Sequence, residues 1–263
     1  MSQRLKDTFA RGKAEGRALF IGYVTGGYPE AADCVPILLA LEAGGTDVIE
    51  MGVPFTDPLA DGATVQHANH IAIEHGVTLA DCLGFVREAR ARGLKAPVAL
   101  MGYHNPILAY GEERLARDAR AAGVDGFIVV DLPPDEGATF LAALRANDLS
   151  LVPLIAPTTT DERIPLLAAA ADAFIYCVSV TGTTGGAHVD VDTLPAFLNR
   201  IRAKSDLPLG VGFGINTRAD VEAVGKLADA VIIGSAIIRA IDAADPQDRA
   251  RGVREFVEDV TGH

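Results

Sequence analysis

Short apolar runs alternate with longer amphipathic segments along the whole chain. Eight runs are apolar at nearly every residue, which is typical of strands buried on both faces of a parallel sheet. The segments between them, such as 78–93 and 135–148, carry an apolar stripe at helical spacing. The eight runs span residues 18–24, 47–52, 96–103, 125–131, 150–157, 173–179, 207–214 and 229–235.

This alternation predicts an α/β fold, a closed (β/α)8 TIM barrel. Eight β-then-α units follow one another without a linker or a break in composition, so we expect residues 1–263 to form one barrel domain. An open doubly wound sheet is the alternative, but it rarely needs eight such regular units. An extra helix precedes the first strand, with Leu5 and Phe9 four residues apart on an otherwise charged surface. A further helical stretch is expected over 63–75.

Composition narrows the classes of function. The 263 residues include 35 acidic and 23 basic side chains, and the formal net charge of −12 argues against nucleic acid as a partner. No apolar run approaches the roughly 18 residues of a membrane span, and the first twenty residues lack the apolar core of an export signal. Cys34, Cys82 and Cys177 form neither a disulfide framework nor a zinc pattern. We therefore expect a soluble cytoplasmic protein.

The active site of such a barrel lies where the strands end. Glu50 is a carboxylate inside the apolar second run, and burial there would raise its pKa and prepare it to move a proton near neutral pH. A Glu paired with a buried cation is the alternative, although no predicted strand supplies one. Asp57 and Asp61 follow in the next loop. Such an Asp is often a turn former or a helix N-cap, so Asp61 could instead cap a helix that starts near Gly62.

Three glycine-containing turns follow later strands. The segment 181–186 is polar and belongs to a connection of roughly fifteen residues, which favours a lid over the substrate; an ordinary flexible surface loop is the alternative. The segments 210–215 and 232–237 place glycines after the last two strands, where barrels bind phosphate with backbone amides and a helix N-terminus. Ser235 can add a hydroxyl donor. The matched pair predicts a site for a phosphate monoester.

Two other groups of residues could carry chemistry. His67, His70 and Glu74 share one face of a predicted helix and could bind a metal, but a solvated helix face is far more common, so we expect no metal. Cys177 could be a nucleophile, with His104 as the nearest candidate base. A buried structural thiol is the favoured interpretation.

Seven segments, in chain order, resemble the tryptophan synthase α subunit family. The string Glu-x-Gly-x-Pro-Phe-x-Asp-Pro-x-Ala-Asp-Gly, from Glu50 to Gly62, is highly specific for that family. Met51, Ala63 and Thr183 depart from its usual residues. The matching segments are VIEMGVPFTDPLADGATVQ, MGYHNPI, VDGFIVVDLPPDE, IAPTTTDERI, YCVSVTGTTGG, GVGFGI and IIGSAI.

The resemblance implies a lyase that cleaves indole-3-glycerol phosphate to indole and glyceraldehyde 3-phosphate in tryptophan biosynthesis. It implies that Glu50 and Asp61 are the catalytic pair, and our hypothesis makes Glu50 a neutral acid in an apolar strand and Asp61 an ionised group in a polar loop. It assigns Tyr103, Ile128, Phe213 and Ile232 to the indole pocket, Tyr176 to the reacting centre, and Thr184 to a lid contact with the loop aspartate. It assigns Gly185, Gly214, Gly234 and Ser235 to the phosphate.

The resemblance also implies a partner. Members of the family work with a β subunit that carries pyridoxal phosphate and receives the indole, usually as an α2β2 heterotetramer, and this chain itself needs no cofactor. Docking is expected through loops that include 54–61 and those after the third strand. The alternatives are a different phosphate-binding barrel enzyme, such as a sugar-phosphate isomerase, a catalytically silent activator subunit, and a free-standing lyase that releases indole.

Overall fold

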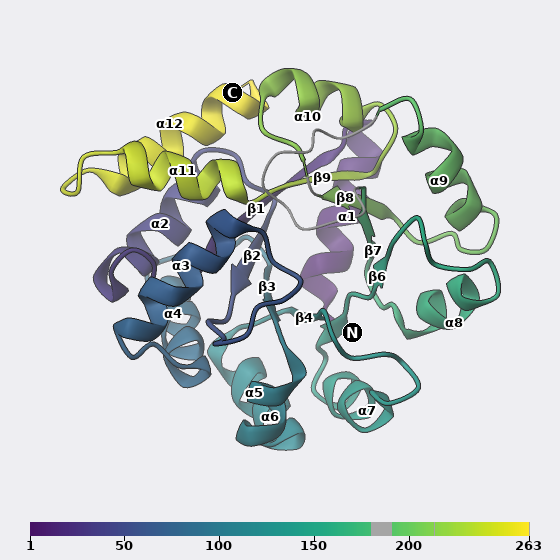
Figure 1. Cartoon of the computed structure of the whole chain (residues 1–263), viewed down its shortest axis with the longest axis horizontal. Helices are drawn as coiled ribbons and strands as arrows, with labels where there is room; N and C mark the ends of the chain where they lie inside the picture. The colour runs from purple at the N-terminus through teal and green to yellow at the C-terminus, as the bar shows by residue number, and fades with distance from the viewer. Residues whose placement is uncertain (180–190, 213, 263) are drawn as a thin grey trace.

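The protein, seen here in a computed structural model that describes residues 1–179, 191–212 and 214–262, is a ring of parallel strands surrounded by helices (Figure 1). The described strands run in the order β5-β4-β3-β2-β1-β9-β8-β7-β6, and each pair of neighbours is parallel. This arrangement confirms the predicted (β/α)8 barrel. The strands are β1 (Leu19–Thr25), β2 (Val48–Gly52), β3 (Val98–Gly102), β4 (Gly126–Val129), β5 (Ser150–Leu151), β6 (Leu154–Ile155), β7 (Ile175–Val178), β8 (Leu209–Gly212) and β9 (Ala230–Ile233).

The fifth predicted strand, residues 150–157, is wrong in extent, because it is divided into β5 and β6. Pro153 lies between the two pieces and has no N–H to give to a ladder, which explains the interruption. The backbone still spans the gap. The amide of Val152 donates to the carbonyl of Phe127 at 2.9 Å, and the carbonyl of Pro153 accepts from the amide of Tyr176 at 3.0 Å. The ring of strands therefore closes through this segment.

Helices cover the outside of the ring (Figure 1). Their apolar faces and those of the strands form one continuous buried cluster, whose removal from water is the main source of stability of such a fold. No helix in the described ranges is both long and apolar enough to span a membrane. The helices after the first strand are α2 (Ala31–Ala43), α3 (Ala63–Glu74), α4 (Leu79–Ala91), α5 (His104–Tyr110), α6 (Glu112–Ala122), α7 (Ala138–Ala146), α8 (Arg163–Ala170), α9 (Leu194–Arg202), α10 (Arg218–Gly225), α11 (Ser235–Ala243) and α12 (Arg249–Thr261).

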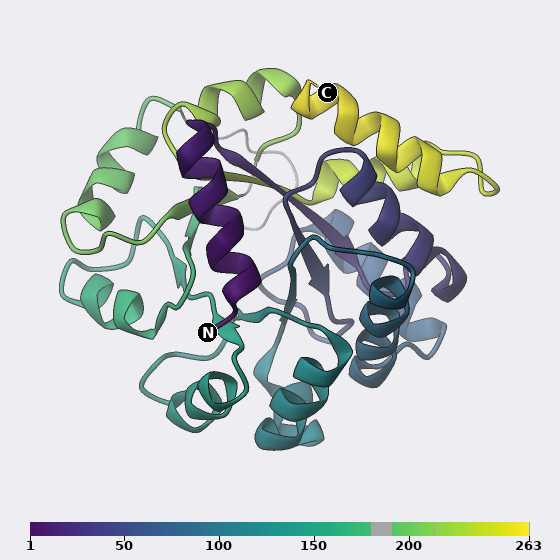
Figure 2. The same ribbon diagram turned by 180° about the vertical axis from the view of Figure 1, so that it is seen from behind.

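The predicted extra helix, α1 (Gln3–Glu15), lies across one end of the barrel (Figure 2). Its two apolar residues face the barrel: Leu5 is fully buried, and the ring of Phe9 stacks on Phe174 with centroids 4.8 Å apart. The helix is also tied down by charge, because Arg4 forms a 2.7 Å ion pair with the buried carboxylate of Asp125. Asp125 follows α6 and precedes β4, so α1 closes the end at which the strands begin.

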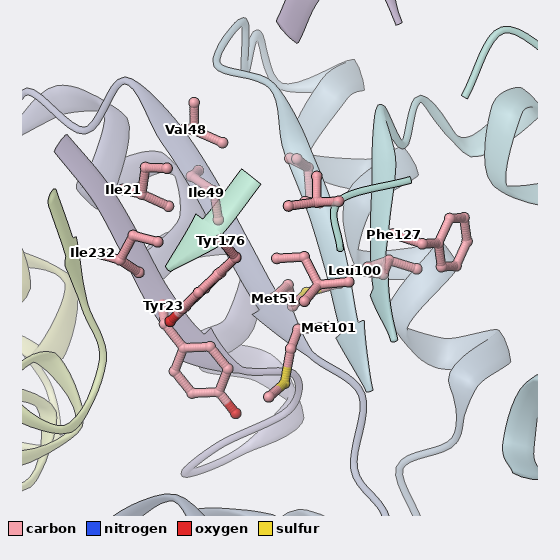
Figure 3. Packing of buried hydrophobic residues seen from close by; sticks show 14 of the residues in the cluster. Ile21, Tyr23, Val48, Ile49, Met51, Leu100, Met101, Phe127, Tyr176 and Ile232 are labelled. Atoms are coloured by element: carbon pink, nitrogen blue, oxygen red, sulfur yellow. The ribbon is translucent and has the colours of Figure 1, made fainter. Parts of the chain in front are cut away.

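The strand register fixes which residues share the barrel interior. In parallel strands, paired residues face the same side of the sheet, and side chains alternate between its two sides. Tyr23 pairs with Glu50, and Glu50 pairs with Ala99. Two residues further along, Thr25 pairs with Gly52, which pairs with Met101. Figure 3 shows Tyr23, Met101 and Tyr176 among the packed side chains.

Candidate active site

Glu50 lies inside the barrel on β2 and is only 2% exposed. Burial raises the pKa of its carboxyl to about 8, and the nearby negative charge of Asp61 adds to the effect. No cation contributes to the shift, and no hydrogen-bond partner for its Oε2 occurs among the described residues. The alternative of a buried ion pair is therefore wrong. At neutral pH the Glu50 carboxyl holds its proton, and an unbonded oxygen is available to a ligand.

Asp61 is also buried, with 4% of its surface exposed, although the polar loop that carries it favours contact with water. Burial raises the pKa of this carboxyl to about 6, while hydrogen bonds from Tyr103 and Asn69 oppose the rise. The Tyr103 hydroxyl donates to Oδ2 at 3.2 Å, and the Asn69 Nδ2 donates to the same oxygen at 3.4 Å. These bonds favour the ionised form, so Asp61 is mostly ionised at neutral pH although it is buried.

The alternative role of Asp61 as a helix cap is wrong as well. The N-cap residue of α3 is Gly62, and no side chain caps the helix. The Asp61 carboxylate instead bonds to side chains from β3's end and from the body of α3, as described above. A carboxyl group that is spared a capping role and held by two donors near Glu50 is free to act on a ligand.

Tyr103 connects the loop after β2 to the site. Its hydroxyl accepts from the amide of Ala60 at 3.0 Å while it donates to Asp61, so one phenol fixes both the loop and the carboxylate. The ring of Phe55 stacks on the Tyr103 ring at 4.8 Å. The structure therefore brings Tyr103, an expected member of the indole pocket, into direct contact with one of the two candidate catalytic groups.

Tyr176, Ile128 and Ile232 lie on the strands that complete the interior. Tyr176 on β7 pairs with Gly210, and its hydroxyl reaches the position of Gly212, where a Cβ would lie 2.3 Å from it. Ile232 on β9 lies close enough to touch a Cβ at Gly210, while Ile128 on β4 pairs with Met101. The three residues are buried. Together with Tyr103 they give the interior an apolar, aromatic lining.

The candidate phosphate residues lie in matching turns. Gly210 on β8 pairs with Ala230 on β9. Gly214 follows Gly210 by four residues, and Gly234 follows Ala230 by four residues. Gly214 has a φ of 76°, which favours glycine, and Gly234 is the N-cap residue of α11, whose first residue is Ser235. Gly234 and Ser235 are partly exposed. The positive end of the α11 dipole and its unbonded amides suit an anion.

Three of the expected site residues, Thr184, Gly185 and Phe213, lie outside the described residues, as does the expected lid at 181–186.

The weaker candidates have ordinary structural surroundings. His70 and Glu74 form an exposed pair at 3.2 Å on α3, and the ring of His67 meets Tyr28 edge-on. No group of three or more His, Cys, Asp or Glu side chains in the described part of the chain could hold a metal. His104 contacts Glu112 at 3.0 Å. Burial raises the pKa of the Cys177 thiol to about 12, which makes it a poor nucleophile.

Sequence reasoning missed three polar residues at the site: Tyr23, Thr25 and Asn69. Asn69 lies on α3 and donates to Asp61, and the Tyr23 and Thr25 hydroxyls bond to each other at 3.2 Å. All three are buried. A signal existed for the pair, since a tyrosine and a threonine two residues apart at the end of an otherwise apolar strand point to the same side of the sheet.

Two buried carboxyl groups with pKa values on either side of neutrality, one on β2 and one in the loop that follows it, define a barrel enzyme that moves protons. Comparison with known proteins agrees with this class. A family model described as "Tryptophan synthase alpha chain" matches residues 9–262. The chain belongs to the tryptophan synthase alpha chain family, which makes it a lyase of tryptophan biosynthesis.

Individual relatives cover nearly the whole chain. The tryptophan synthase alpha chain of Roseiflexus sp. (strain RS-1) is 47% identical over 98% of this chain and 99% of its own length. The tryptophan synthase of Saccharomyces cerevisiae is 46% identical over 99% of this chain, which spans only 37% of that longer protein. A solved structure of Mycobacterium tuberculosis tryptophan synthase has a TM-score of 0.90 and 35% identity, covering 100% of this chain and 98% of the other.

Proposed function

We propose that this chain cleaves indole-3-glycerol phosphate to indole and glyceraldehyde 3-phosphate, with Glu50 and Asp61 as its catalytic pair. The observation that carries the proposal is the pair of buried carboxyl groups whose pKa values, about 8 and about 6, leave one protonated and the other ionised at neutral pH. Two such groups in one site can supply an acid and a base at the same time.

The chemistry requires a proton on the ring before the bond breaks. Direct scission between indole C3 and the glycerol carbon would leave a carbanion on an aromatic ring. Protonation of C3 first gives an indolenine-type tautomer whose ring nitrogen can accept the bonding electrons. Loss of the proton from the adjacent glycerol hydroxyl then forms the aldehyde carbonyl, the carbon–carbon bond breaks, and its electrons restore the indole ring.

The two carboxyl groups divide these steps. Glu50 donates its proton to C3 and then, as the carboxylate, takes the proton of the glycerol hydroxyl, so it ends the cycle as it began. Asp61 accepts a hydrogen bond from the indole N–H and balances the positive charge that protonation places on the ring. Each proton transfer contributes roughly 10²–10⁴-fold to the rate. Tyr103 and Asn69 hold Asp61 in place for this role.

The rest of the proposed site binds the two ends of the substrate. Tyr103, Ile128 and Ile232 bury the indole, and Tyr176 lies beside the reacting centre. The amides at Gly214 and Gly234, with the Ser235 hydroxyl, bind the phosphate. Binding energy gained at these ends orients the reacting bond. Gly185 is a further proposed phosphate contact, Phe213 completes the indole pocket, and Thr184 is proposed to meet Asp61 when the lid closes.

We further propose that the chain works in the cytoplasm as the α subunit of an α2β2 heterotetramer and carries no cofactor of its own. Pyridoxal phosphate belongs to the β subunit, which receives the indole. Exposed leucines support docking through the expected loops: Leu59, within 54–61, is 83% exposed, and Leu108 on α5, which follows β3, is 55% exposed. A β subunit that docks on these loops would cover both leucines.

The direct test is release of indole from indole-3-glycerol phosphate, measured for the chain alone and with a β subunit added. Glu50→Gln should lower the cleavage rate at least about a hundredfold while the substrate still binds. Glu74→Gln is the matched control, because that carboxylate is exposed on α3 and should leave the rate unchanged. Near-normal turnover by Glu50→Gln would remove the assignment.

The indole-release assay separates two of the alternatives, and gel filtration separates the third. A sugar-phosphate isomerase would release no indole, and a silent activator subunit would show no residual cleavage by the chain alone. A free-standing lyase would remain unassociated in gel filtration with a β subunit.

A further inference from the structure

Tyr23 occupies a position in the site that the proposed mechanism does not use. It lies on β1 directly opposite Glu50 in the register, and it is 5% exposed. Its ring begins next to Gly234, where a Cβ would lie 3.2 Å from the Tyr23 Cδ1. Its hydroxyl ends over Gly52, where a Cβ would lie 2.2 Å from the oxygen. Glycines at both ends of the side chain give it room.

The side chain therefore spans a particular stretch of the barrel. One of its ends touches the turn that we propose for the phosphate, and the other reaches β2 two residues beyond Glu50. In indole-3-glycerol phosphate, the portion between the phosphate and the carbon that Glu50 protonates is the glycerol chain. That portion carries two hydroxyl groups, one of which loses its proton during cleavage.

The hydroxyl of Tyr23 has hydrogen-bonding capacity to spare. It bonds to the Thr25 hydroxyl at 3.2 Å, and either oxygen can be the donor. Two hydroxyls carry two donor hydrogens, and their mutual bond uses one. No further hydrogen-bond partner of either hydroxyl occurs within residues 1–179, 191–212 and 214–262. A buried donor without a partner costs free energy unless a ligand supplies an acceptor.

Tyr23 also remains protonated when it is needed as a donor. Burial and the negative charges of Asp61 and Glu50 raise the pKa of its phenol well above the usual value, while the hydrogen bond with Thr25 opposes the rise. The hydroxyl is thus a neutral donor at every pH at which Glu50 can act as the acid.

We infer that the hydroxyl of Tyr23, anchored by Thr25, hydrogen-bonds the glycerol chain of the substrate and holds its hydroxyl group beside Glu50. The inference rests on the proposed function and assigns a specific part of that substrate to a residue outside the catalytic pair. Tyr23 is then a specificity residue, because it distinguishes a hydroxylated chain from a plain alkyl chain between the same indole and phosphate groups.

The experiment compares two ligands that differ only in these hydroxyl groups. Indole-3-propanol phosphate has the indole ring and the phosphate of the substrate but no hydroxyl on the connecting chain. Calorimetric titration with both ligands uses the full chain carrying Glu50→Gln, in which cleavage of the substrate is slowed, with and without Tyr23→Phe. Phenylalanine keeps the ring against Gly234 and removes only the hydroxyl.

We expect Tyr23→Phe to weaken the affinity for indole-3-glycerol phosphate about threefold to tenfold, as for one hydrogen bond, and to leave indole-3-propanol phosphate unchanged. Tyr110→Phe, which removes a phenol hydroxyl bonded to Asp118 on the outer helices, should change neither affinity. Equal affinities with and without the Tyr23 hydroxyl, or an equal loss for both ligands, would overturn the inference.

A failure of the proposed function would look different. If the Glu50→Gln chain cleaved the substrate normally, or if the unmodified chain bound neither ligand, the catalytic assignment or the substrate itself would be wrong. Either result would be seen without the Tyr23→Phe substitution, so it would contradict the proposed function and not the role of Tyr23 alone.

Discussion

Tyr103 donates its phenol hydroxyl to the carboxylate of Asp61 across 3.2 Å, from a strand end to the loop that follows a neighbouring strand. This bond favours the ionised form of a carboxyl whose pKa burial raises, because a donor stabilises negative charge. The ionisation of Asp61, and with it the pH range of the enzyme, depends on a contact between two separate βα units.

The first prediction is a bell-shaped dependence of kcat/KM on pH. Cleavage requires Asp61 ionised and Glu50 protonated, so kcat/KM should rise with pH around 6 and fall around 8. The two carboxyl groups interact, so the limbs report the pair as a unit. Initial rates of indole release at low substrate concentration, measured from pH 5 to 9, provide the check. A profile that is still rising at pH 9 would contradict a protonated Glu50.

The second prediction concerns Tyr103→Phe, which removes the donor to Asp61. The pKa of Asp61 should rise, so the acid limb should move to higher pH while the limb near 8 stays in place. The same pH profile measures the shift. Tyr110→Phe serves as the control because its hydroxyl bonds to Asp118 on α6, outside the site. An unmoved acid limb in Tyr103→Phe would mean that another group sets it.

The third prediction is that Glu50 destabilises the fold above acidic pH. The pKa of Glu50 is about 8 in the folded chain against an ordinary value of 4.5, so between these values the folded state holds a proton that the unfolded state has released. Stability from this group is therefore complete below about pH 4.5 and falls as pH rises toward 8. Glutamine lacks this titration. Urea midpoints should show Glu50→Gln gaining stability relative to the unmodified chain between pH 5 and 8, and a constant difference would refute the burial argument.

The fourth prediction concerns Gly52. Alanine there would place a Cβ 2.2 Å from the Tyr23 hydroxyl and 2.8 Å from its Cζ, so the ring must move. We expect Gly52→Ala to lower the free energy of unfolding by about 1–3 kcal/mol and to impair cleavage. Gly84→Ala is the control, since nothing lies within 4 Å of its Cβ in α4, and it should stabilise the chain by about 0.5–1 kcal/mol. Denaturation and indole release measure both variants, and a fully active, stable Gly52→Ala chain would count against the packing described for Tyr23.

The barrel architecture could be predicted from the sequence because it depends on local patterns of apolar and polar residues. Eight apolar runs and the helices between them require no knowledge of long-range contacts, and the register then places Glu50 inside. The division of the fifth strand could also be read locally, because Pro153 cannot donate to a ladder. The continuous apolar pattern of residues 150–157 led to the prediction of one uninterrupted strand.

The burial of Asp61 was beyond the reach of sequence patterns. The loop that holds it is rich in polar and turn-forming residues, which favours exposure. Its burial comes with contacts distant in sequence, such as those from Tyr103 after β3 and Asn69 on α3, which no local pattern predicts. The role inferred for the Tyr23 hydroxyl could not be predicted from the sequence for a similar reason. Its hydroxyl matters because Gly52 on the next strand and Gly234 near the end of β9 leave space for it, and no local pattern connects those three positions.

The break at Pro153 has a consequence for the motions of the barrel. On each side of it only two residue pairs join the chain to its neighbours, β5 to β4 and β6 to β7, whereas β1 and β2 share five pairs. The two arcs of the ring therefore meet at a sparsely paired seam, comparable with the two pairs shared by β8 and β9, and we expect the amides of 150–155 to exchange with deuterium sooner than those of β1 and β2. The seam lies opposite β1, the strand that carries Tyr23, the register partner of Glu50. An opening of the ring at the seam would therefore leave Glu50 on strands that are joined by five residue pairs.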